Sequence, residues 1–551
     1  MINFSSKNRP AIICQMTNTN FDLLIIGGGI TGAGIALDGT ARGLKVALID
    51  MQDFASGTSG RSTKLIHGGL RYLKQLEFRL VAEVGKERKI VHKNAPHLTK
   101  PEHMLLPIVK TGSLNKFSAR AAMWVYEFIA GVKKEERHTV LSKEETLIAE
   151  PLLKKENIVG GILFYEYRTD DARLTIEVLK EAAEGGAIIM NYLKADSFIY
   201  DDNKIIGVNA LDQVSGGLHK IKTKYVINAG GPWVDEIDNM DQKQKQHKLH
   251  ISKGIHLVVD WKKLPLKQSV YFDTYDKRMI FAIPREGKTY LGTTDTFYTG
   301  DITHPTITNH DRDYILKCVN DFFPGHKIAV ADLDSGWAGL RPLVNKPGKG
   351  PSEISRKDEI FESPSGLITI AGGKLTGYRK MAQRIVDMIA KKILAIDNKK
   401  IPACNTQNIP LSGGKIGKGA SFSQFKKSKI PQGLLLGLSI TEIEILTYRY
   451  GSNIDELYQI IKIQKEDRAS RLPLIIQAQL IYCIEKEMCA TPSDFFIRRT
   501  GALYFNIESV KKWKEPVVKY MQTLIGWSDE LRDKFYKELE SALLEIANIK
   551  N

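Results

Sequence analysis

The sequence predicts an α/β protein (α+β overall) with a parallel sheet that is discontinuous in the chain, an antiparallel sheet and an all-helical C-terminal domain. Three patterns lead to this prediction. Short apolar runs that end in glycines begin at residues 21, 226 and 367. Strand-like segments fill residues 256–295, and beyond about residue 438 the periodicity is helical. At 551 residues the chain is too long for a single hydrophobic core.

The first apolar run opens a strand–turn–helix–strand unit. We expect a buried parallel strand at 21–26, a second strand at 46–49 and a helix of small residues between them. The turn after the first strand reads Gly27-x-Gly29-x-x-Gly32. This arrangement is typical of a Rossmann-like dinucleotide-binding fold.

The residues of this unit each have a physical role in such a fold. Gly27 allows the tight turn, Gly29 lets the backbone approach a pyrophosphate, and Gly32 lets helix and strand pack closely. The phosphates then lie at the N–H groups of the positive end of the helix. Asp50, which ends the second strand, would bind both ribose hydroxyls of an adenosine.

Two later segments repeat the pattern of a strand followed by glycines: VINAGGPW at 226–233 and LITIAGGKLTGYR at 367–379. All three strands would deliver their glycines to one cofactor site, so the nucleotide-binding domain must be discontinuous in sequence. The segment 54–72, rich in small, hydroxylated and basic residues, is expected to line the same site.

These patterns divide the chain as follows. We expect a loose N-terminal extension (1–20), a nucleotide-binding part (about 21–110, 170–235 and 335–398), a substrate domain (about 111–169 and 236–334), a linker (399–437) and a helical C-terminal domain (438–551). In the last part, Thr441 and Ser528 are the predicted N-caps of two helices.

Composition limits the partners. The net charge of +16 favours anionic partners: phosphorylated metabolites, anionic membrane surfaces or nucleic acid. No zinc-finger, RRM or basic-helix pattern supports nucleic acid. The five cysteines are scattered without a CxxC, which predicts neither a disulfide framework nor a metal site and favours a reducing compartment.

Membrane contact, if any, is expected from the side. Residues 1–20 have no apolar secretory core, and no uninterrupted apolar run approaches the roughly 18 residues of a span. The segment 114–132 is apolar and aromatic with basic edges. Such a helix can lie in a membrane interface, and it can equally be a core helix with solvated ends.

Basic residues in turns marked by glycine or proline form a candidate substrate site. They are Arg71, Arg285, Arg341, Arg356, Lys374 and Arg379, with His67 and Tyr72 beside Arg71, and His256 is expected near the same cleft. Converging guanidinium and ammonium groups suit a phosphate or a carboxylate. His67 is either a general base or a structural residue, and the sequence does not decide between these roles.

Several motifs together resemble one family. They are IIGGGITGAGIA, GTSGRSTKLIHGGLRYL, YRTDDARLTIEVL, VINAGGPWVD, FAIPREGKTYLGTTD, GLRPLV, EISRKDEI and IAGGKLTGYRKMA. In this order they resemble the FAD-dependent, quinone-linked glycerol-3-phosphate dehydrogenases, from about residue 21 to about 394 and weakly beyond. The resemblance implies FAD as cofactor and oxidation of sn-glycerol 3-phosphate at C2 to dihydroxyacetone phosphate. It also implies electron transfer to a membrane quinone by a cytoplasmic, peripheral protein on the inner face of the cell membrane. A homodimer is a further expectation.

The resemblance also implies roles for individual residues. The substrate or catalytic set is His67, Arg71, Tyr72, Arg341, Arg356 and Lys374, to which we add Arg285 and His256. The FAD-binding set is Gly27, Gly29, Gly32, Asp50, Thr58, Ser59, Ser62, Thr63, Ala229, Gly230, Gly372, Gly373 and Thr376. One position departs from the family, which more often has Glu where this chain has Asp50, and Asp53 is the alternative ribose ligand.

The expected mechanism is hydride transfer. Basic side chains hold the phosphate and orient C2 against flavin N5, and His67, or a water held by Arg71 and Tyr72, takes the O2 proton. Three alternatives remain: an oxidase that uses oxygen and yields hydrogen peroxide, an amine or amino-acid oxidase on the same fold, and a flavin-binding scaffold without turnover.

Overall fold

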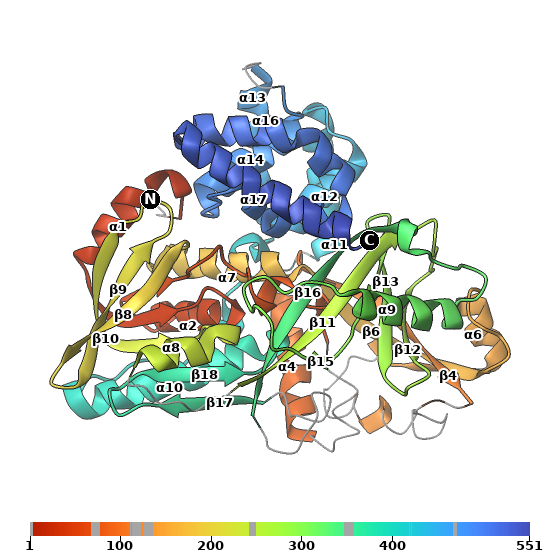
Figure 1. The fold of residues 1–551 in the computed structure, drawn as a ribbon, viewed down its shortest axis with the longest axis horizontal. Helices are drawn as coiled ribbons and strands as arrows, with labels where there is room; N and C mark the ends of the chain where they lie inside the picture. Colours follow the sequence, from red (N-terminus) through yellow and green to blue (C-terminus); the bar gives the residue numbers. More distant parts are fainter. Residues whose placement is uncertain are drawn as a thin grey trace.

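A computed structural model describes residues 4–67, 78–110, 112, 123–125, 127, 136–241, 249–345, 357–417, 419, 421–466 and 471–550. The predictions for Arg71, Tyr72 and Arg356, and for most of the helix at 114–132, lie outside these described residues. Figure 1 shows two sheets side by side, with the C-terminal helices (blue) lying across the same end of both.

The first sheet contains the predicted nucleotide-binding strands. Along its main path the order is β17 (Asp358–Glu362), β18 (Ile368–Gly372), β10 (Leu218–Asn228), β1 (Asn20–Ile26), β2 (Val46–Ile49) and β7 (Ile188–Met190), with β9 (Lys204–Asp212) on β10 and β8 (Leu193–Asp201) on β9. β1 pairs in parallel with β2 and β10, and β10 with β18. The three glycine-ended strands are therefore neighbours, and the discontinuous parallel sheet is confirmed.

The second sheet is mainly antiparallel. Its main path is β15 (Thr296–Phe297), β11 (Leu249–Asp260), β14 (Lys288–Gly292), β13 (Met279–Arg285), β12 (Ser269–Asp273), β4 (Thr99–Val109), β6 (Ile158–Thr169) and β3 (Leu65–Ile66), with β16 (Leu333–Val344) on β11 and β5 (Thr139–Leu141) on β6. The predicted boundaries differ from the structure here, because β4 and most of β16 fall within the predicted nucleotide-binding part but belong to the second sheet. A buried apolar run such as 104–108 does not reveal which sheet it joins.

Helices cover the sheets and form the C-terminal domain. They are α1 (Arg9–Thr17), α2 (Ile30–Ala41), α4 (Phe78–Asn94), α6 (Lys143–Ala149), α7 (Asp171–Glu184), α8 (Val234–Met240), α9 (Asn309–Phe322), α10 (Tyr378–Asp397), α11 (Phe422–Leu435), α12 (Ile440–Tyr450), α13 (Ile454–Glu466), α14 (Leu474–Lys486), a π-helical turn η10 (Asp494–Arg499), α15 (Ala502–Phe505), α16 (Ile507–Ile525) and α17 (Asp529–Asn548). α2 packs between α7 and α10. Within the described residues, no helix has the length and apolar character needed to cross a bilayer.

Two segments expected to be irregular are helical. The N-terminal extension contains α1, which buries Ile12 and Met16 and is held by an ion pair of 2.5 Å between Arg9 and Asp212. The expected linker contains α11, whose N-terminus is closed by a capping box at Ser421. Contacts with distant residues stabilise α1, and the sequence of the N-terminal extension does not reveal them. The helix α11 could have been predicted from its capping box.

The helix caps of the C-terminal domain are partly as predicted. Ser528 accepts a hydrogen bond from the Leu531 N–H and caps α17. α12 ends before Gly451, but its N-cap is Ser439 and not Thr441, because the Ser439 hydroxyl accepts from the Glu442 N–H.

Candidate active site

A cavity of about 910 Å³ opens between the two sheets and collects residues from many parts of the chain. Predicted residues that line it are Gly27, Gly29, Asp50, Thr58, Ser59, Ser62, Thr63, His67, Ala229, Gly230, His256, Arg341, Gly372, Gly373, Lys374 and Thr376. The volume lies in the upper part of the range for cofactor sites. Among the described predicted residues, Gly32, Asp53, Arg285 and Arg379 do not line the cavity.

The glycine turn after β1 leaves no room for side chains. Gly27 has φ +115°, and a Cβ atom there would lie 2.5 Å from the Ala229 carbonyl oxygen. A Cβ atom on Gly32 would lie 1.9 Å from the Gly27 carbonyl oxygen. The strand end, the turn and α2 are therefore in direct backbone contact, which leaves the N-terminus of α2 beside the cavity. Here the Ile30 N–H donates to the Ser59 hydroxyl at 2.9 Å.

Asp50 is oriented by backbone donors. Its Oδ2 accepts from the Gly28 N–H at 2.6 Å and its Oδ1 from the Gln52 N–H at 2.8 Å. Burial raises the pKa of Asp50 to about 7, although both hydrogen bonds favour the charged form. The carboxyl group is thus fixed at the end of β2 on the cavity wall, where a ribose is expected.

The loop with the predicted hydroxyl ligands is held from behind by protein groups. The Thr58 hydroxyl donates to the Leu340 carbonyl at 2.6 Å. The Ser62 hydroxyl donates to Asp171 Oδ2 at 2.7 Å. The Thr63 hydroxyl lies 3.0 Å from His256 Nε2. These contacts fix the backbone of the loop against the cavity.

His256 is a buried, neutral imidazole. Its ring stacks on Trp337 with 4.7 Å between centroids. Burial, with Arg341 and Lys64 nearby, holds the pKa of His256 well below its usual range. The Nδ1 atom is buried and has no hydrogen-bond partner among the described residues. His256 therefore positions Thr63 at the cavity wall.

Basic groups line the cavity from both sheets. Arg341, on β16, donates to Asp295 Oδ1 at 3.2 Å and to the Thr293 hydroxyl at 3.0 Å. Gly254 makes room for this side chain, because a Cβ there would lie 2.3 Å from the guanidinium group. Lys374 follows β18, and His67 contacts the Phe281 ring edge-on at 6.4 Å between centroids. The guanidinium group of Arg341, the ammonium group of Lys374 and the imidazole of His67 thus line the same cavity.

The structure corrects three predictions. Arg379, on α10, is buried and pairs with Glu87 at 2.5 Å, so it is not a substrate ligand. Arg285 is buried beneath the C-terminal domain, where it pairs with Asp170 at 3.0 Å and lies over the Phe505 ring, so it is not a substrate ligand. Asp53, the alternative ribose ligand, is fully buried and pairs with Arg498 and Arg499.

Sequence reasoning missed part of the cavity wall on the side of the antiparallel sheet. Tyr271, Arg278 and Phe281, from β12, the following turn and β13, line the cavity. The only available signal was the turn TYDKR between two predicted strands. It marks a hairpin but does not show that the hairpin faces the cofactor side.

The fold and the cavity are those of a dinucleotide-dependent oxidoreductase, and comparisons with known proteins identify the dinucleotide as FAD. The profile of the family described as FAD dependent oxidoreductase matches residues 22–379, and that of the C-terminal domain of alpha-glycerophosphate oxidase matches residues 404–532. The chain belongs to the family of FAD-dependent oxidoreductases that includes the aerobic glycerol-3-phosphate dehydrogenases.

Several relatives are similar over their full length. The aerobic glycerol-3-phosphate dehydrogenase of Bacillus subtilis is 51% identical over 541 residues, which cover 98% of both chains. That of Staphylococcus aureus is 50% identical over 549 residues, covering 99% of this chain and 98% of the relative. The crystal structure of the glycerol-3-phosphate dehydrogenase from Bacillus halodurans complexed with FAD has a TM-score of 0.85 and 47% identity, with 98% of both chains covered.

FAD is the cofactor of this family, and the cavity fits it. The close-packed Gly27 turn, the N-terminus of α2 and the oriented Asp50 carboxyl group supply the pyrophosphate and ribose contacts that a dinucleotide needs. The resemblance to the family, including FAD in place of a nicotinamide cofactor, is thereby confirmed.

FAD affinity is expected to rise with pH. The carboxyl of Asp50 is neutral below and charged above its pKa of about 7. Ribose hydroxyls donate hydrogen bonds, so FAD binds the charged form better, and affinity should increase by up to about tenfold per pH unit below pH 7 and level off above it. Titration of apoprotein with FAD from about pH 5.5 to 8.5 measures this. Asp50→Asn should abolish the slope, and a flat profile in the unmodified protein would contradict it.

Proposed function

We propose that this protein oxidises sn-glycerol 3-phosphate at C2 to dihydroxyacetone phosphate. The observation that supports this most directly is the presence of Arg341, Lys374 and His67 in the cavity that also holds the FAD-binding turns. The relatives that share about half of its residues are named for this reaction. The substrate of an amine or amino-acid oxidase has a single carboxylate and an amine, so such an enzyme needs fewer cationic side chains in its cavity than are found here.

In the proposed reaction the protein positions the substrate and moves one proton. Arg341 and Lys374 bind the phosphate, the guanidinium as a fork and the ammonium as a point charge. Bound FAD supplies the acceptor for the C2 hydride. The O2 proton passes to His67, or to a water held by Arg71 and Tyr72, and C2 becomes a carbonyl carbon. His256, which is neutral, adds no positive charge to the cavity wall.

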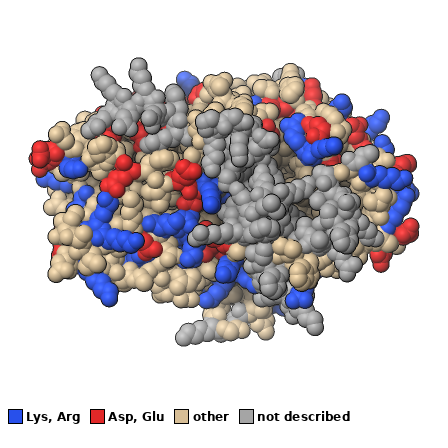
Figure 2. Space-filling view, turned by 90° about the horizontal axis from the view of Figure 1, so that it is seen from below, with Lys and Arg blue, Asp and Glu red and all other residues tan. Residues whose placement is uncertain are grey.

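We propose a membrane quinone as the electron acceptor and a peripheral position on the inner face of the cell membrane. The aromatic, base-edged sequence at 114–132 supports membrane contact, and Trp124 within it has an exposed side chain. On the face shown in Figure 2, the described Lys and Arg side chains are interspersed with Asp and Glu. The proposal of membrane contact therefore relies on the 114–132 segment and not on a basic patch of that face.

Anaerobic mixing with sn-glycerol 3-phosphate tests the proposed function. We expect the flavin absorbance near about 450 nm to bleach, because hydride transfer reduces the cofactor. Reoxidation that is fast with a quinone analogue and slow with oxygen supports the dehydrogenase. The opposite order identifies an oxidase. A folded, FAD-loaded protein that does not bleach would overturn the substrate, and a flavin-binding scaffold would then be the better description.

A further inference from the structure

The segment from Asp50 to Ala55 has two opposed faces. Asp50 lines the cofactor cavity, whereas Asp53, three residues later, is fully buried on the far side. There Asp53 Oδ2 accepts from Arg498 Nε at 2.5 Å and from Arg499 Nη1 at 2.7 Å, and its Oδ1 accepts from Arg499 Nη2 at 3.0 Å. The segment that presents the ribose ligand is thus bound directly by two side chains of the C-terminal domain.

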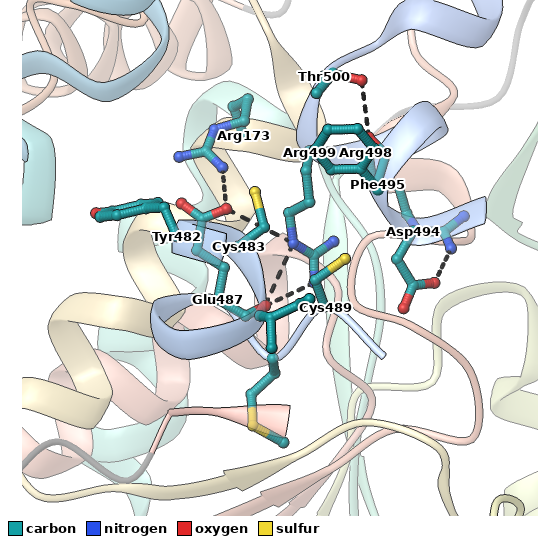
Figure 3. Close-up of polar contacts among 12 residues, drawn as sticks. Arg173, Tyr482, Cys483, Glu487, Cys489, Asp494, Phe495, Arg498, Arg499 and Thr500 are labelled. Atoms are coloured by element: carbon teal, nitrogen blue, oxygen red, sulfur yellow. Dashed lines mark hydrogen bonds and ion pairs between the residues drawn. The ribbon is translucent and has the colours of Figure 1, made fainter. Parts of the chain in front are cut away.

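These two arginines are themselves rigidly held. They lie in the π-helical turn η10, where Asp494 Oδ1 accepts from Arg498 Nη2 at 2.6 Å. Arg499 Nη2 also donates to the Glu487 carbonyl at 2.7 Å. Figure 3 shows Arg499 and Glu487 in direct contact, with the Asp494–Arg498 pair beside them. The guanidinium groups therefore arrive at Asp53 from a fixed position.

The same cluster reaches a second cofactor loop. Arg173, on α7, donates to Glu487 Oε2 at 2.6 Å (Figure 3). The first residue of α7, Asp171, accepts from the Ser62 hydroxyl at 2.7 Å and from Lys64 Nζ at 2.6 Å. α7 thus connects the C-terminal domain to the loop that lines the cavity at 58–63.

Charge balance makes this cluster act as a unit. Asp53, Glu487 and Asp494 face Arg173, Arg498 and Arg499, and all six side chains are at least 90% buried. Arg173 and Lys180 lower the pKa of Glu487 to about 2, and Arg499 and Arg498 hold that of Asp53 far below its usual range, so both stay charged. Burial and the neighbouring Asp53 raise the pKa of Asp494, and Arg498 and Arg499 oppose this rise. Removing one member takes an ionic partner from a buried charge, which is strongly unfavourable.

Two other contacts of the C-terminal domain do not reach the cofactor cavity. Arg312, on α9 of the antiparallel-sheet domain, donates to the Ile549 carbonyl at 3.0 Å, and the Ser335 hydroxyl donates to the Tyr504 carbonyl. Neither Arg312 nor Ser335 lines the cavity. Contacts such as these would be enough to attach the C-terminal domain. The ionic cluster does more, because it contacts the Asp50 segment and, through α7, the loop at 58–63.

We propose that the C-terminal domain retains FAD, and that Arg498 and Arg499 are positioning residues that hold the Asp50 segment in place through Asp53. This role concerns the cofactor and not the substrate, so it is independent of the proposed reaction. It gives the helical domain, none of whose described residues line the cavity, a direct effect on cofactor affinity.

The test compares two buried interdomain arginines. Holoenzyme with Arg498→Gln, and with Arg312→Gln as matched control, is diluted, and the release of FAD is followed by flavin fluorescence well below the unfolding temperature. We expect Arg498→Gln to release FAD at least about tenfold faster than wild type, because Asp53 loses one of its two cationic partners. The Arg312→Gln variant should release FAD at the wild-type rate. The proposal is overturned if Arg498→Gln releases FAD at the wild-type rate. It is also overturned if Arg498→Gln and Arg312→Gln both release FAD faster than wild type and to the same extent.

Two further measurements separate positioning from general loosening. Arg498→Lys keeps the positive charge but cannot donate to Asp53 and Asp494 at the same time as a guanidinium group does, so its rate of FAD release should lie between those of wild type and Arg498→Gln. If Arg498→Gln does not fold, Arg498→Lys takes its place in the test. The pH midpoint of FAD affinity, set by the buried Asp50, should fall in Arg498→Lys, because the positive charge that lowers the pKa of Asp50 is kept while water reaches the segment. If Arg498→Lys releases FAD faster but the pH midpoint of FAD affinity is unchanged, the effect comes from loosening of the whole C-terminal domain. This result would overturn the positioning role of Arg498.

Discussion

Gly32→Ala is expected to yield a protein that does not retain FAD. The new Cβ would lie 1.9 Å from the Gly27 carbonyl oxygen, so α2 must move away from the turn that binds the pyrophosphate. Overpacking against backbone costs about 3 kcal/mol, which corresponds to roughly a 100-fold loss of FAD affinity. The ratio of flavin to protein absorbance after purification, followed by titration with FAD, measures the effect.

A second glycine provides the control. A Cβ atom on Gly325 would meet no described atom within 4 Å, and the backbone there is not left-handed, so Gly325→Ala should bind FAD like the wild type. Gly32→Ala protein with a full complement of FAD would show that α2 and the turn separate easily, and would remove the close-packing argument.

Arg341→Gln is expected to destroy most activity without loss of the cofactor. The side chain lines the cavity and its guanidinium group is oriented by Asp295 and Thr293. Loss of a charge-assisted contact to a phosphate costs about 4 kcal/mol, so kcat/KM for sn-glycerol 3-phosphate should fall roughly 1,000-fold. Steady-state kinetics with a quinone analogue measure the loss, and flavin absorbance confirms that FAD remains bound.

The matched variant for this prediction is Arg341→Lys. It keeps the positive charge but cannot form two parallel hydrogen bonds, so its kcat/KM should lie between wild type and Arg341→Gln. An Arg341→Gln enzyme with normal kcat/KM would remove this residue from the substrate site and leave Lys374 as the main phosphate ligand. Loss of FAD in Arg341→Gln would instead indicate a structural role.

Short local sequence patterns predict the cofactor-binding turn and several helix ends. The Gly27 turn and Asp50 lie within the single stretch 21–50, and the caps at Ser421 and Ser528 depend on residues three positions apart, so their physical roles are readable in the sequence. The Ser421 cap was readable but overlooked.

Tertiary structure decided what depends on distant partners. Arg285 and Arg341 both stand beside a proline in the sequence, yet one faces Asp170 beneath the C-terminal domain and the other faces the cavity. Which face of a sheet a strand residue occupies, and what covers that face, is set by pairing with other strands and domains.

By itself, then, the sequence determined the dinucleotide fold, the cofactor turns and the family, because these are encoded in short, contiguous motifs. Only the tertiary structure decided the second sheet's membership, the place of Arg285 and the role of Asp53. Asp53 meets Arg498 across 445 positions of the chain, and no local periodicity or spacing encodes a contact between groups so far apart.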